Sequence, residues 1–181
     1  KRAGCWVLAF GVESVNQHML DQMKKKNKLD RAPEAIRMTR EARIETRASY
    51  LLGLPGETYE SAMKTIAFAK DIASNVATFH FAVPFPGTEL LTQCRSDSNY
   101  QDIPWGKMVL MGDRPLFVPS TISESDLISL YNLAWKTYYF TPKVVYRNLT
   151  AIRSFTDVRR YYVGAKTIFS RQDKHKEFAC P

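Results

Sequence analysis

The chain has 181 residues, of which 45% are hydrophobic and 24% charged, an ordinary composition for a globular protein with a core of its own. No apolar run approaches the ~18–20 residues of a membrane-spanning helix, so the sequence excludes one, and the early Glu13 argues against a signal peptide at the basic N-terminus. The formal net charge is +8.

The positive charge is concentrated at the two ends of the chain. Residues 1–50 hold eleven Lys/Arg against six Asp/Glu, and residues 151–181 hold seven against three, whereas the middle is near neutral. Solvated helix faces and a polar tail are the favoured explanation. The alternative is a site for an anionic ligand or a nucleic acid.

The three cysteines, Cys5, Cys94 and Cys180, are far apart in the sequence. Their odd number and wide spacing argue against a disulfide framework and favour a reducing compartment, so we expect a cytoplasmic protein. They also match no local spacing of metal ligands.

The first elements are a short strand and two helices. Trp6 to Phe10 is a continuous apolar run, typical of a strand buried on both faces in a parallel sheet. Helices are predicted over 16–25, with Asn16 as N-cap, and over 31–42, with Asp30 as N-cap.

The next two strands each lead through a glycine turn into a helix. Ala48 to Leu52 precedes Gly53-Leu54-Pro55-Gly56-Glu57-Thr58 and a helix over 59–74, while Val76 to Val83 precedes Pro84-Phe85-Pro86-Gly87-Thr88-Glu89-Leu90 and a short helix from near Thr88. The order β-α-α-β-α-β-α predicts an α/β fold with right-handed crossovers. Turns of this kind place backbone N–H groups where ligands bind.

The remaining chain is predicted to be mainly helical. Residues 96–122 have the composition of a long loop, lid or linker. Helices are expected over 123–140, 143–151 and 154–169, followed by a polar end at 171–181. We therefore divide the chain into 1–95, 96–122 and 123–181.

Taken in order, several segments resemble radical SAM enzymes, most closely members that also carry an N-terminal cobalamin-binding domain. The matching segments are Ala3-Gly4-Cys5, Phe10-Gly11-Val12-Glu13-Ser14, Leu20, Met23 and Lys25, and both glycine turns. Tyr138-Tyr139-Phe140-Thr141-Pro142 resembles the helical tail that follows the barrel in those members.

The resemblance implies half of a partial, parallel TIM-type barrel, namely strands four to six. S-adenosylmethionine would lie across the carboxyl ends of the strands and chelate a 4Fe–4S cluster. Its reductive cleavage would give a 5′-deoxyadenosyl radical for hydrogen abstraction or methyl transfer. The Cys-x3-Cys-x2-Cys loop that holds the cluster is absent from these residues, and Cys5 precedes its strand at the wrong end. We therefore expect a C-terminal fragment or a degenerate member that binds no cluster alone, with cobalamin use depending on a further domain.

The resemblance also suggests roles for individual residues, all in binding the cofactor, with no catalytic residue and no metal ligand. Glu13 would meet a ribose hydroxyl or an amino group, Ser49 the ribose and Lys25 the methionine carboxylate. Phe85, Pro86 and Gly87 would meet the adenine, while Gly53, Pro55 and Gly56 would shape a turn near the ligand. The alternatives are that Glu13 is a helix-dipole partner or a plain surface acid, that Lys25 belongs to a solvated Lys24–Lys26 run, and that Ser49 is bonded to the backbone. The two turns could serve packing only.

Three further positions bear on these assignments. His80 could face the barrel interior, although a core histidine is the favoured interpretation. Val15 and Arg43 stand where glycine is usual, and at Arg43 a left-handed residue is expected after the second helix.

Two other functions remain open. One is a non-catalytic module that binds RNA or another anionic partner through its basic ends and its aromatic residues, which is possible but not favoured. The other is a cluster-free assembly scaffold, whose first strand would offer an open edge to another chain or to the missing N-terminal half of the barrel.

Overall fold

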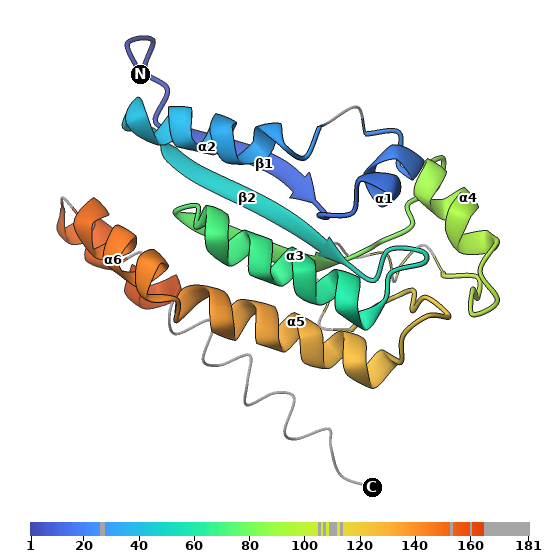
Figure 1. Cartoon of the computed structure of the whole chain (residues 1–181). Helices are drawn as coiled ribbons and strands as arrows, with labels where there is room; N and C mark the ends of the chain where they lie inside the picture. Colours follow the sequence, from blue (N-terminus) through green and yellow to red (C-terminus); the bar gives the residue numbers. More distant parts are fainter. Residues whose placement is uncertain are drawn as a thin grey trace, which may run out of the picture.

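The computed structural model describes residues 1–25, 28–104, 106, 108, 112, 114–152, 154–159 and 161–164. Three strands, β1 (Val7–Glu13), β2 (Glu45–Leu52) and β3 (Val76–Phe81), form one parallel sheet in the order β1-β2-β3. Helices α2 (Arg31–Glu41) and α3 (Tyr59–Ile72) connect successive strands, and Figure 1 shows both crossing beside the sheet. The predicted α/β class and the strand–helix alternation are confirmed.

The register of the sheet brings the ends of the three strands together. Gly11 of β1 pairs with Ser49 of β2, and Ser49 pairs with Thr78 of β3. Because the strands are parallel, their carboxyl ends meet at one edge. The two glycine turns and the residues after β1 therefore share that edge.

Several helices begin at a side-chain cap, and the predicted cap at Asn16 is confirmed. The Asn16 side chain accepts hydrogen bonds from the N–H groups of His18 and Met19 at the start of α1 (Gln17–Gln22), Thr58 forms a capping box with Ser61 at α3, and Thr88 accepts from Leu91 N–H at α4 (Glu89–Arg95). Asp30 does not cap α2, which corrects the prediction. Its backbone is already helical, so its side chain makes no cap hydrogen bond.

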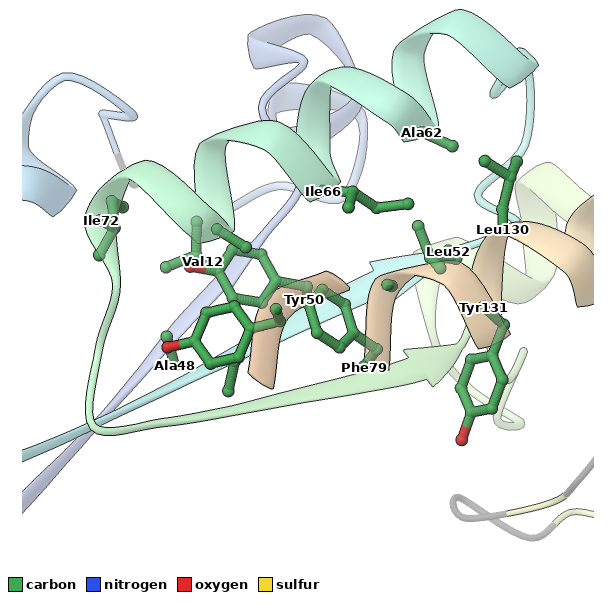
Figure 2. Close-up of a cluster of buried hydrophobic side chains, with 14 of the residues drawn as sticks. Val12, Ala48, Tyr50, Leu52, Ala62, Ile66, Ile72, Phe79, Leu130 and Tyr131 are labelled. Carbon is green, nitrogen blue, oxygen red and sulfur yellow. The ribbon is translucent and has the colours of Figure 1, made fainter. Parts of the chain in front are cut away.

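The core lies between one face of the sheet and the helices (Figure 2). Tyr50 and Phe79 stack with ring centroids 5.3 Å apart, and α3 and α5 (Glu124–Tyr139) pack over them. On β2 and β3 burial alternates, so the opposite face carries half-buried and exposed side chains such as Arg47, Ser49 and Thr78. We call this second face the open face.

β1 is not buried on both faces, contrary to the prediction from its apolar run. Ala9, which pairs with Arg47 of the open face, is exposed, and Leu8, which pairs with the buried Thr46 near the start of the strand, is 41% exposed. In the described part of the chain β1 pairs only with β2, and the helices cover one face. An edge strand covered on one side exposes apolar residues that a central strand would bury.

The C-terminal helices pack onto the same core. α5 contributes Leu127, Leu130 and Tyr138, and the Tyr138 hydroxyl donates to the Ser74 carbonyl at 2.6 Å. α6 (Pro142–Ala151) begins at a proline in its first turn, where proline is tolerated. The described residues of 96–122 include no strand and no α-helix, and residues 155–159 and 161–164 are helical. The predictions for 165–169 and 171–181 lie outside the described residues, and the division into three regions stays a prediction.

Candidate functional site

Three loops at the carboxyl ends of the strands are held together by a small apolar cluster separate from the main core. Met19 of α1, Leu54 of the first glycine turn and Ala82 after β3 are its buried members. Outside the cluster, the exposed Lys24 also pairs with Glu89 of α4 at 2.6 Å, a surface ion pair that adds little to this packing. The loops that carry the predicted binding residues are therefore fixed relative to one another.

Glu13 ends β1 in an unusual conformation. The register shifts between Gly11 and Glu13, which marks a β-bulge, and Glu13 has a left-handed φ of 67°. A non-glycine residue in this region costs about 1–2 kcal/mol. The Glu13 carboxylate forms an ion pair with Lys25, with Oε1 2.5 Å from Nζ.

The end of α1 places Lys25 for this pair. Lys24 has a φ of 55° and donates its N–H to the Asp21 carbonyl, while Lys25 N–H donates to the Leu20 carbonyl, both at 2.9 Å. This arrangement is a Schellman motif, which turns the chain sharply after the helix. Of the adjacent lysines Lys24 and Lys25, only Lys25 meets Glu13.

The Glu13–Lys25 pair lies over the open face of the sheet. A Cβ atom on Gly11 would be 2.6 Å from Glu13 Oε1 and 3.1 Å from Lys25 Nζ. Paired residues of neighbouring strands point to the same face, so the pair lies on the side of the sheet that carries Ser49 and Thr78. Glu13, Lys25 and Ser49, which the sequence analysis assigned to one site, thus lie on the same side of the sheet, and their role as ligands stays a prediction.

Thr78 and His80 extend this face. Both are half-buried, alternate with the buried Phe79 and Phe81, and lie on the same side as Ser49. His80 is therefore not a core side chain, contrary to the favoured expectation. Thr78 was missed, and only its alternation with buried aromatic residues could have indicated it.

The first glycine turn is organised by a buried acid that sequence reasoning also missed. The Glu57 side chain is fully buried, and its Oε2 accepts hydrogen bonds from the N–H groups of Gly53 at 2.6 Å and Leu54 at 3.4 Å. Its Oε1 has no hydrogen-bond partner among the described residues. Burial raises the pKa of the Glu57 carboxyl to about 7, although the two N–H groups oppose this shift.

The glycines of the two turns serve different needs. Gly53, Gly56 and Gly87 all have positive φ, as expected of glycine turns. A Cβ on Gly53 would also be 2.9 Å from Leu127 Cδ2, whereas no described atom lies within 4 Å of the Cβ position at Gly56 or Gly87. Gly53 is thus required for packing, while the surroundings of Gly56 and Gly87 leave room for a ligand.

In the second turn the Phe85 backbone is already used. Phe85 N–H donates to the Val83 carbonyl at 2.9 Å, and the Phe85 carbonyl accepts from both the N–H and the hydroxyl of Thr88. Gly87 N–H has no hydrogen-bond partner among the described residues and is exposed. Among these peptide groups of the described chain, Gly87 N–H is therefore the exposed donor without a partner.

Known proteins match this chain in sequence and in fold. An uncharacterized methyltransferase of Pyrococcus horikoshii is 26% identical over 149 residues, 82% of this chain and 32% of that protein. The anaerobic magnesium-protoporphyrin IX monomethyl ester cyclase of Cereibacter sphaeroides is 26% identical over 178 residues, 98% of this chain and 28% of that enzyme. The archaeal Elp3 of Methanocaldococcus infernus shares the fold, with a TM-score of 0.54, 15% identity and coverage of 74% of this chain and 27% of that chain. No protein-family model matches.

The matches cover the ordered motifs and the parallel sheet that carries them at one edge. These matches support the resemblance of the chain to radical SAM enzymes. It spans about a third or less of the length of the curated relatives it matches. Its α/β sheet is consistent with part of a radical SAM barrel.

The described residues do not fit the iron–sulfur cluster of radical SAM proteins. They contain no group of three or more His, Cys, Asp or Glu side chains that could hold a metal ion. Cys5 precedes β1, at the end of the sheet opposite the candidate site, and Cys94 is buried in α4. In the described part of the chain, no helix has the length and hydrophobicity to cross a membrane.

Proposed function

We propose that this chain supplies one wall of the S-adenosylmethionine site of a radical SAM protein. The observation that carries the proposal is the row formed by the Glu13–Lys25 pair and Ser49 on the open face, beside the two glycine turns. The carboxylate of Glu13 and the hydroxyl of Ser49 can form hydrogen bonds with the ribose hydroxyls of this cofactor. The ammonium group of Lys25 can bind the carboxylate of its amino-acid part.

The pairing of Glu13 with Lys25 leaves donors and acceptors for a ligand. A lysine ammonium has three N–H groups and uses one toward Glu13 Oε1, so two stay available for a carboxylate. The remaining Glu13 oxygen can accept a ribose hydroxyl. The pair also keeps Lys25 in place before a ligand arrives, which reduces the entropy lost on binding.

The redox chemistry would belong to the cofactor and to a 4Fe–4S cluster whose ligands lie outside the described residues. When bound, these groups would supply the chemistry of reductive sulfonium cleavage for hydrogen abstraction or methyl transfer. This chain's residues would bind and orient the nucleoside and amino-acid ends and exclude water from them. Cobalamin use would depend on a further domain.

Calorimetric titration of the full chain with S-adenosylhomocysteine tests the proposal. We expect Lys25→Met to weaken binding at least about tenfold, because one charge-assisted bond contributes about 1.5–3 kcal/mol. Lys24→Met is the matched control, since that neighbouring ammonium pairs with Glu89 and should change binding little. Equal losses in the two variants, or unaltered binding by Lys25→Met and Ser49→Ala together, would refute the assignment.

We also propose that β1 pairs through its outer edge with another strand, either from the N-terminal half of a barrel or from a second copy. Among the described residues that edge has no strand partner, and a hollow lined by Ala9, Phe10 and Leu29 runs beside it. Sedimentation of the chain over a range of concentrations tests the second case. Dimerisation that Ala9→Pro abolishes supports pairing between copies, whereas a monomer at all concentrations excludes it.

A further inference from the structure

Two arginines from different helices meet at the C-terminus of α3, at the end of the sheet opposite the candidate site. Arg40 of α2 and Arg147 of α6 both donate an Nη1 hydrogen to the Ile72 carbonyl, at 3.4 and 3.5 Å. Figure 1 shows the end of α2, the end of α3 and α6 gathered on this side of the molecule. The two guanidinium groups are therefore neighbours.

A third cation joins them. Lys143, one turn before Arg147 on α6, donates to the Asp71 carbonyl at 2.6 Å. The C-terminus of a helix carries about half a negative charge, and basic side chains often bind its carbonyls. That half charge does not balance three full positive charges.

The described residues offer these cations no carboxylate partner. No ion pair within 4.0 Å joins Arg40, Lys143 or Arg147 to an acidic side chain in the described part of the chain. Partial burial and the nearby Arg40 charge lower the pKa of the Arg147 guanidinium, which is consistent with repulsion between the two groups. Each guanidinium has five N–H groups and uses one here, so the cluster retains many free donors.

The surroundings favour a ligand with both charge and rings. Tyr146, adjacent to Arg147 on α6, is 72% exposed. Arg43 is exposed at the end of α2, three residues beyond Arg40. Arginine forks bind phosphate groups, and an exposed aromatic ring can stack on a base. The net charge of +8 would attract a polyanion.

We propose that Arg40, Lys143 and Arg147 bind the phosphate groups of a single-stranded nucleic acid, with Tyr146 stacking on one of its bases. The site is distinct from the open face, because it lies at the amino ends of the strands. A protein segment rich in acidic residues could also pair with the three cations. Its carboxylates would not stack on the exposed Tyr146 ring, whereas a base would.

The test is fluorescence anisotropy of a labelled oligoribonucleotide of about twelve nucleotides, titrated with the full chain at several salt concentrations. The double variant Arg40→Gln/Arg147→Gln should bind at least about tenfold more weakly. Its log–log salt dependence should be shallower by about 1.4, since each phosphate contact on a single strand contributes about 0.7. The control Lys64→Gln/Arg95→Gln removes two charges elsewhere and should keep most of the affinity. Equal losses in the two double variants would refute a local site.

A second variant separates binding from folding, because the arginines also cap α3. Tyr146→Ala removes an exposed ring, so the melting temperature should stay unaltered while affinity falls about fivefold to tenfold or more, the usual effect of losing one stacked base. The salt dependence should not change, since tyrosine carries no charge. Two results would overturn the nucleic-acid assignment. One is that oligoglutamate of equal length displaces the labelled RNA as well as unlabelled RNA does, and the other is full affinity in Tyr146→Ala.

Discussion

Glu13 and Lys25, twelve residues apart in the sequence, form an ion pair beside the position that a Cβ atom on Gly11 of β1 would take. The carboxylate reaches back across Gly11, whose missing Cβ leaves the space that both charged groups occupy. A left-handed Glu13 and a left-handed Lys24 both contribute to this geometry. Backbone strain of this kind persists where the surrounding structure enforces it, and it is frequent at functional sites.

Gly11→Ala should separate the pair without unfolding the chain. Gly11 does not have a positive φ, so alanine fits the backbone, and the atoms it meets are the mobile ends of two side chains. We expect a loss of stability below about 1 kcal/mol. Binding of S-adenosylhomocysteine should fall about tenfold, because Lys25 loses its fixed position. Urea unfolding and calorimetry measure the two effects.

Gly164→Ala provides the matched control for this change. No described atom lies within 4 Å of the Cβ position there, and the residue is exposed. Both stability and binding should stay within error of the parent chain. If Gly11→Ala also left binding unaltered, the ion pair would have no part in the site.

Glu57 should make the stability of the chain depend on pH. The folded chain keeps the Glu57 proton up to about pH 7, whereas the unfolded chain releases it near the ordinary value of 4.5. The folded state therefore binds more protons between these values, and its free energy of unfolding falls as the pH rises through that window. The shift corresponds to a loss on the order of 3 kcal/mol.

Glu57→Gln should remove this dependence. The amide oxygen can accept the hydrogen bonds of Gly53 and Leu54 but carries no charge to desolvate. Urea unfolding at pH 5 and pH 8 should show the parent chain losing more stability than the variant. Glu60→Gln, an exposed acid three residues later, should follow the parent chain. Parallel pH profiles for the parent and Glu57→Gln would show that Glu57 is ionised in the folded chain throughout.

Element boundaries were predicted best from the sequence where a neighbouring side chain defines them. Thr58 and Thr88 each stand before a helix and cap it, because a hydroxyl at that position needs only its own neighbours. The start of β2 was placed three residues late, at Ala48. Thr46 is a polar residue that is fully buried. Its burial is tolerated because its N–H and its hydroxyl both donate to the side-chain oxygen of Asn75, twenty-nine residues away. No local pattern reports such a contact.

The candidate site divides in the same way. The family resemblance and the strand ends were enough to predict Glu13, Lys25 and Ser49 as site residues. The placement of Glu13 and Lys25 over Gly11 depends on a β-bulge and a Schellman motif, which no pattern in the sequence predicted. Glu57 was assigned no role because acidic residues are usually exposed. Its position four residues after Gly53, in a turn with free N–H groups, was the available signal.

Arg43→Gly should stabilise the chain. Arg43 follows α2 with a φ of 57°, and its N–H and that of Ile44 bond to the Arg40 and Thr39 carbonyls as in a Schellman motif. The left-handed residue expected there is confirmed, and glycine adopts this conformation without steric cost. We expect a gain of about 1 kcal/mol, seen as a higher urea midpoint at constant m value. Arg37→Gly, inside the same helix, should instead lose about 1 kcal/mol. Equal losses in both would mean that the Arg43 side chain stabilises the fold.

Gly53→Ala and Gly87→Ala should differ in cost although both glycines have positive φ. Gly87→Ala meets no described atom within 4 Å, so it should lose only the conformational term of about 1–2 kcal/mol. Gly53→Ala also presses on Leu127 Cδ2, and overpacking of a core adds about 1–3 kcal/mol. Urea unfolding gives both values.

The Leu127→Ala background isolates this packing contribution. Shortening Leu127 removes the atom that the new methyl group would meet, so Gly53→Ala should then cost no more than Gly87→Ala. The short distance between the Gly53 Cβ position and Leu127 shows that the first glycine turn lies against α5. If the cost of Gly53→Ala were the same in both backgrounds, backbone conformation alone would account for the glycine, and α5 would not constrain the turn.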